Sequence, residues 1–143
     1  MTGAVQVPAG PRVRNATLAR LPIAAGRYLA SSYLKPMSFS DYPLLEPTEI
    51  TTGIYLITDL DQRVRWLGQA NRDGGLIARL DEHARSREKA AVFATLRILH
   101  LVDLAPPDVV DVIEGRCADL LKLRGTMGPR RWPSADDWLA RVA

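Results

Sequence analysis

The chain has 143 residues, 47% hydrophobic and 24% charged, a composition typical of one soluble globular unit. No stretch approaches the roughly 18 consecutive apolar residues of a membrane span, and the N-terminus lacks the apolar run of a secretory signal. Cys117 is the only cysteine and cannot form an internal disulfide, so we expect a cytoplasmic protein with no membrane partner.

Positive charge is concentrated at the N-terminus. Residues 1–40 contain five basic residues and no acidic one, whereas the rest of the chain carries 14 basic and 16 acidic groups. A basic arm on a near-neutral domain is suited to contact phosphates. A solvated leader without a partner is the alternative interpretation.

The first fifty residues predict an arm, one helix and a linker. Residues 1–14 lack apolar periodicity and indicate an extended arm. Asn15 is suited to cap a helix over residues 16–34, which Pro22 either kinks or starts. Three prolines in residues 35–50 favour a linker. We therefore expect an N-terminal extension over 1–50 and the main domain over 51–143.

The main domain shows the order β-β-α-β-α-α. The expected elements are strands over 52–60 and 62–70, a helix over 76–87, a strand over 92–104, and helices over 108–125 and 135–143. The short connection between the first two strands predicts an antiparallel hairpin. The expected fold is α/β (α+β), a small three-stranded, mostly antiparallel sheet flanked by helices.

Two tripeptides and three polar residues give this order a family resemblance. Gly53-Ile54-Tyr55 on the first strand and Trp66-Leu67-Gly68 on the second resemble the motifs that name the GIY-YIG nuclease family. Arg79 and Glu114 match that family's helix arginine and metal-binding glutamate, and His83 matches a histidine of some of its restriction enzymes. The resemblance implies a GIY-YIG-like fold and metal-dependent hydrolysis of a DNA phosphodiester, with Mg²⁺ or Mn²⁺ as the cofactor.

The resemblance, which covers about residues 51–133, implies four catalytic residues. These are Tyr55, Arg79, His83 and Glu114, with Glu114 also the metal ligand. Arg79 and His83 are four residues apart and share one helix face. Arg79 is suited to stabilise charge on a phosphate in the transition state, or else forms a surface salt bridge with Asp81 or Glu82.

The other three catalytic candidates also have plainer interpretations. His83, with an ordinary pKa of about 6.5, is suited to take a proton from water or from Tyr55, or it is simply an exposed helical histidine. Tyr55 is suited to orient or deprotonate the attacking water, helped by His83, or it simply fills the core. Glu114 stands beside an apolar helix stripe, which favours either a bound Mg²⁺ or an ion pair with Arg116 or Arg79. We expect Arg79, His83 and Glu114 to meet over the hairpin.

Three departures from the family pattern support a second hypothesis. Trp66 replaces the family's second tyrosine, and an indole cannot accept a proton. No asparagine follows Glu114, and Gln69 stands where a basic residue is common in the family. The alternative to an endonuclease is therefore a catalytically degenerate module that binds nucleic acid or a partner protein.

The expected partner is DNA, and a homo-oligomer or larger assembly is left open. The residues expected to contact nucleic acid are Arg12, Arg14, Arg20, Arg27, Trp66, Gln69 and Arg72.

Overall fold

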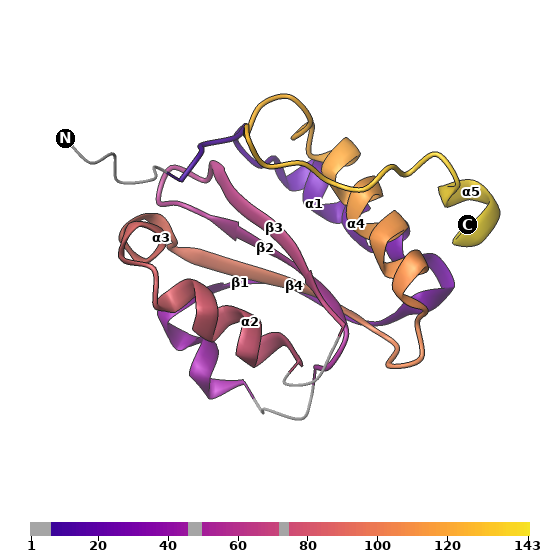
Figure 1. Ribbon diagram of the computed structural model, residues 1–143, viewed down its shortest axis with the longest axis horizontal. Helices are drawn as coiled ribbons and strands as arrows, with labels where there is room; N and C mark the ends of the chain where they lie inside the picture. The colour runs from indigo at the N-terminus through magenta and orange to yellow at the C-terminus, as the bar shows by residue number, and fades with distance from the viewer. Residues whose placement is uncertain (1–6, 46–49, 72–74) are drawn as a thin grey trace.

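The computed structural model of the chain describes residues 7–45, 50–71 and 75–143 (Figure 1). Its elements are α1 (Asn15–Ala25), η1 (Gly26–Tyr28), β1 (Leu29–Ser38), η2 (Phe39–Leu44), β2 (Gly53–Thr58), β3 (Val64–Ala70), α2 (Gly75–Ala84), α3 (Arg87–Val92), β4 (Thr95–Leu101), α4 (Pro107–Leu120) and α5 (Trp138–Arg141). Within the part of the chain that the structure describes, no helix is both long enough and apolar enough to cross a membrane.

The strands form one antiparallel sheet of four strands in the order β1-β4-β2-β3. The hairpin predicted from the sequence is present as β2 and β3, and Tyr55 on β2 lies opposite Gly68 on β3. β3 is an edge strand. The arm before α1 pairs with the start of that edge. A single bridge joins Arg12 to Arg63, and the Gly10 N–H donates to the Val64 carbonyl at 2.8 Å.

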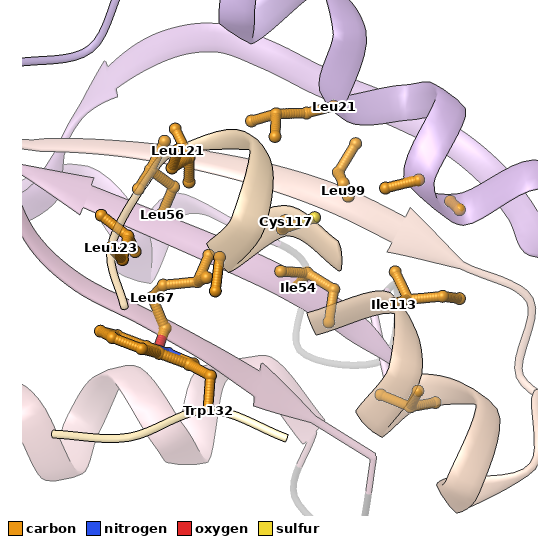
Figure 2. Packing of buried hydrophobic residues seen from close by; sticks show 14 of the residues in the cluster. Leu21, Ile54, Leu56, Leu67, Leu99, Ile113, Cys117, Leu121, Leu123 and Trp132 are labelled. Atoms are coloured by element: carbon orange, nitrogen blue, oxygen red, sulfur yellow. The ribbon is translucent and has the colours of Figure 1, made fainter. Parts of the chain in front are cut away.

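Helices cover both faces of the sheet. Alternate residues of β2 point to opposite faces, so Ile54 packs in one hydrophobic cluster and Tyr55 in the other. α1 and α4 cover the first face, and α2 covers the second (Figure 1). Figure 2 shows the first cluster, in which Cys117 on α4 packs near Ile54 and Leu99 of the sheet. Because both faces of β2 are covered, all six of its residues are buried.

The N-terminal half of the predicted architecture needs correction. Residues 29–38, expected as the end of a helix and the start of a linker, form β1, so the sheet has four strands rather than three. β1 pairs with β4 from Leu29 opposite Leu101 to Ser38 opposite Thr95. This pairing satisfies backbone groups along β4 that the hairpin cannot reach, and it overrides local helix preference. The expected boundary at residue 50 therefore divides a single sheet.

α4 positions the acidic part of the candidate site. Pro107 stands at its first turn, where a missing N–H costs nothing, and Ile113 and Cys117 are fully buried against the sheet. The next residue after Ile113 is Glu114, which is only 4% exposed. The predicted helix end at Gly125 is wrong, because the helix stops at Leu120 and Lys122 adopts a left-handed backbone with φ of 58°.

Candidate active site

A cavity of about 460 Å³ lies at the β3 edge of the sheet, where α2 and α4 approach from opposite faces. All four predicted catalytic residues, Tyr55, Arg79, His83 and Glu114, line it. The structure thus brings together the guanidinium, the imidazole and the carboxylate that the sequence analysis expected to meet over the hairpin. They meet around its free edge, not on one face of the sheet.

Tyr55, His83 and Lys89 form a hydrogen-bonded chain along one wall of the cavity. The Tyr55 hydroxyl lies 2.7 Å from His83 Nε2, and Lys89 Nζ lies 3.0 Å from His83 Nδ1. A charged lysine offers only donors, so Nδ1 accepts from Lys89 and the ring proton stays on Nε2. The Nε2–H then donates to the Tyr55 oxygen, which leaves the hydroxyl's own proton for an acceptor in the cavity.

Burial keeps both Tyr55 and His83 neutral near pH 7. Burial raises the pKa of Tyr55 to about 12. Burial, reinforced by the positive charges of Lys89, Arg130 and Arg79, lowers the pKa of His83 to about 3. The expected role of His83 as a proton acceptor near neutral pH stays a prediction. In the structure the neutral ring contacts the Tyr55 hydroxyl through Nε2 and Lys89 through Nδ1.

The buried neutral histidine predicts an acid-sensitive fold. The pKa of His83 in the folded state is about 3, below the ordinary 6.5. The neutral ring therefore makes its full contribution to the unfolding free energy above pH 6.5, and this contribution is lost as pH falls toward 3. In this window the unfolding free energy should fall by up to about 1.4 kcal/mol per pH unit from this group alone. Urea denaturation between pH 7 and pH 4 measures the slope.

His83→Gln is the matched variant, because its amide offers one acceptor to Lys89 and one donor to Tyr55. We expect the unfolding free energy of this variant to depend less steeply on pH than that of the wild type. The carboxylates of the chain contribute equally to the pH dependence of both proteins. Parallel curves for the two proteins would show that His83 is not the acid-sensitive group.

Gly68 makes room for the Tyr55 hydroxyl. A Cβ atom added at Gly68 would lie 2.7 Å from the Tyr55 oxygen and 2.9 Å from Trp66 Nε1. The Trp66 ring is itself enclosed by protein groups, with Lys89 Nζ 4.1 Å and the Arg130 guanidinium 4.5 Å from its centroid. Trp66 therefore forms part of the wall of the cavity, and its expected contact with nucleic acid stays a prediction.

Gly68→Ala should disturb both the fold and the site. The added methyl group forces the Tyr55 ring away from His83, at a cost of about 1–3 kcal/mol in unfolding free energy. Chemical denaturation measures the loss. The His83 ring ¹⁵N resonances report whether the Tyr55 contact is broken, and unchanged resonances together with wild-type stability would contradict the close packing described above.

Glu114 occupies the opposite wall, with one oxygen hydrogen-bonded and the other in an ion pair without a hydrogen bond. Gln69 Nε2 donates to Glu114 Oε1 at 2.9 Å and to Asp111 Oδ1 at 2.7 Å, so one amide holds two carboxylates. Asn71 in turn donates to Gln69 Oε1 at 3.0 Å. Glu114 Oε2 is buried without a hydrogen bond, and its partner is Arg130, whose Nη2 lies 3.8 Å away in an ion pair. Burial raises the pKa of Glu114, which the Gln69 hydrogen bond opposes.

The acidic wall fits a hard divalent cation that keeps most of its water ligands. A buried carboxylate oxygen without a hydrogen bond is costly, and a cation would reduce that cost. Mg²⁺ is commonly bound by one or two carboxylates and several waters, which is the number that Glu114 and Asp111 offer. Among residues 7–45, 50–71 and 75–143, no cluster of three or more His, Cys, Asp or Glu side chains could enclose a metal.

Two arginines give the cavity its positive side. Arg79 forms one ion pair, with Glu82 at 3.5 Å, and its side chain is 48% exposed, so it can exchange this exposed partner for an anion. Arg130 is held more firmly, because its Nη2 donates to the Leu67 carbonyl at 2.9 Å on the outer edge of β3. Carboxylates and guanidinium groups thus face the same hollow, an arrangement that suits a phosphate bridged by a cation.

The structure places the residues predicted to contact nucleic acid at several different sites. Gln69 belongs to the cavity but holds its carboxylates, and Arg72 lies outside the described residues. Arg12, Arg14 and Arg20 line a separate hollow. Arg27 lies in neither, and donates to the Tyr28 hydroxyl at 3.1 Å and the Arg141 carbonyl at 3.3 Å.

Three participants in the site were not predicted. Lys89, Asp111 and Arg130 line the cavity, yet none stands in a recognisable motif. Asp111 lies three residues before Glu114 on α4, a spacing that places both on one helix face and offered the only usable signal. Lys89 and Arg130 reach the site through contacts with residues distant in sequence.

Comparison with protein-family models, curated proteins and solved structures finds no match to this chain. The functional assignment therefore depends on the chemistry of the cavity.

Proposed function

We propose that the chain is a metal-dependent endonuclease that hydrolyses phosphodiester bonds in DNA at the β3-edge cavity, as its resemblance to GIY-YIG nucleases implies. One observation carries the proposal: Glu114 Oε2, which is buried without a hydrogen bond, and the half-exposed Arg79 guanidinium line the same cavity although they come from opposite faces of the sheet. A cation ligand and a phosphate ligand at one place are the minimum that phosphoryl chemistry requires.

Each wall of the cavity has a distinct part in this reaction. Glu114, positioned by Gln69 and accompanied by Asp111, holds the cation. When bound, a divalent cation supplies a Lewis acid that neutralises phosphate charge and makes water more acidic. Arg79 pairs with a non-bridging phosphate oxygen and stabilises the charge of the transition state.

Tyr55 serves as a hydrogen-bond donor in this scheme. Its pKa of about 12 keeps it protonated at neutral pH, and its oxygen already accepts from His83 Nε2–H. The hydroxyl proton is then directed at an oxygen of the bound phosphate. Lys89 and His83 act through Tyr55 and are positioning residues.

Plasmid cleavage tests the proposal. Supercoiled DNA incubated with the protein should be nicked or linearised in Mg²⁺ or Mn²⁺ and should remain intact in EDTA. Cutting that persists in EDTA, or no cutting in either cation with several DNA substrates, would contradict it.

The second candidate is a module that binds DNA without cutting it. The observation favouring it is Trp66, which stands where the GIY-YIG pattern has a tyrosine. Its indole ring is enclosed by Lys89 and Arg130. DNA binding that is unaffected by EDTA, together with no cleavage, identifies this alternative.

A further inference from the structure

A second hollow on the molecule is lined by charges of one sign. It has a volume of about 350 Å³ and lies between the N-terminal arm, the start of α1 and the end of α4. Its charged residues are Arg12, Arg14, Arg20 and Lys122, and no acidic residue lines it. All four side chains are exposed. Within the described ranges none of them has a hydrogen bond or ion pair that would neutralise its charge.

The fold holds these cations together. The arm is hydrogen-bonded to the β2–β3 connection, since Val13 N–H donates to the Gln62 carbonyl and Val64 N–H to the Pro11 carbonyl. α1 begins in the same place without a side-chain cap and without an acidic residue in its first turn. The positive end of that helix therefore adds to the charge of the side chains. Like charges gathered in one hollow repel each other, and an anion relieves that repulsion.

The position of this hollow points to one kind of anion. Leu120, the last residue of α4, lines the hollow and follows Glu114 by six residues. At a rise of about 1.5 Å per residue, the two positions lie about 9 Å apart along the helix axis. Phosphates about three nucleotides apart on a duplex strand have a similar axial separation, at about 3.4 Å per nucleotide.

We propose that the hollow lined by Arg12, Arg14, Arg20 and Lys122 binds a backbone phosphate of the same DNA whose scissile phosphate enters the β3-edge cavity. This inference rests on the proposed function and adds a fixed direction for the strand along α4. It also separates the basic arm into a part that binds DNA and a part, at Arg27, that does not.

Fluorescence anisotropy with a labelled 20-base-pair duplex in EDTA tests the inference without cleavage. Lys122→Gln and Arg14→Gln should each raise Kd about three- to tenfold and reduce the slope of log K against log salt by about 0.9. Lys35→Gln is the matched control, because Lys35 is also exposed but lies on β1, at the opposite edge of the sheet. An equal effect of Lys35→Gln and Lys122→Gln would overturn the proposal.

Two further results separate this inference from the proposed function. Metal-dependent cleavage with DNA binding insensitive to Lys122→Gln and Arg14→Gln overturns the phosphate hollow and leaves the nuclease. Salt-sensitive binding that these variants weaken, without any cleavage, supports the hollow and rejects the nuclease. Binding to vesicles rich in anionic lipid, with no binding to the duplex, overturns the inference.

Discussion

Glu114→Gln should abolish metal-dependent DNA cleavage, with a loss of at least about 10³-fold in rate, because it removes the charge that holds the cation. The amide has nearly the same shape as the carboxylate, so the packing of α4 should survive. Since Glu114 is buried and its pKa is raised by burial, the neutral variant should be as stable as the wild type in EDTA, or more so.

Metal-induced stabilisation provides a measurement that does not depend on activity. A cation that binds only the folded chain raises its thermal midpoint as the cation concentration rises. We expect Mg²⁺ or Mn²⁺ to raise the midpoint of the wild type and not that of Glu114→Gln. Below the raised pKa of Glu114, protons should compete with the cation and reduce the effect.

Glu82→Gln is the matched control for this prediction. Glu82 lines the same cavity from α2, but its side chain is 59% exposed and needs no cation. Its neutralisation should leave both cleavage and metal stabilisation close to wild type. If Glu82→Gln and Glu114→Gln behave alike, the cation site is wrongly placed.

The local parts of the fold could be predicted from the sequence, and the pairing of distant parts could not. The hairpin and the helices α2 and α4 have clear periodicity and short connections, and these signals depend only on residues close together in sequence. The first part of β1 reads as a helix in the sequence because its strand conformation depends on β4, whose paired residues lie 57 to 72 positions later in the chain. No property of residues 29–34 alone indicates that partner.

The same distinction applies to the site. Arg79 and His83 were expected to act together because four residues separate them on one helix, and both line the cavity. The sequence does not indicate Lys89, which approaches His83 from the following helix and lies 3.0 Å from Nδ1. Arg130 lies over Trp66 because the C-terminal segment crosses the β3 edge, a contact between residues 64 positions apart. Motifs identified the chemical groups, whereas their protonation depends on tertiary neighbours.

Arg79→Lys should reduce the rate of the chemical step by about 10²–10³-fold and leave DNA affinity nearly unchanged. Lysine keeps the charge but loses the planar fork that binds two phosphate oxygens at once. Arg79 has little structural role, because its contact with Glu82 is long and half-exposed, so the fold should tolerate the change. Single-turnover cleavage at saturating DNA measures the chemical step, and anisotropy in EDTA measures affinity.

Arg85→Gln is the control for a general loss of positive charge, since Arg85 follows α2 directly and is exposed outside the cavity. A transition-state role requires that Arg79→Lys lowers the rate while Arg85→Gln does not. A weaker Kd with an unchanged single-turnover rate would instead make Arg79 an ordinary binding contact. The cavity would then lack its charge-stabilising group, and the module that binds DNA without cutting it would be the better description of the chain.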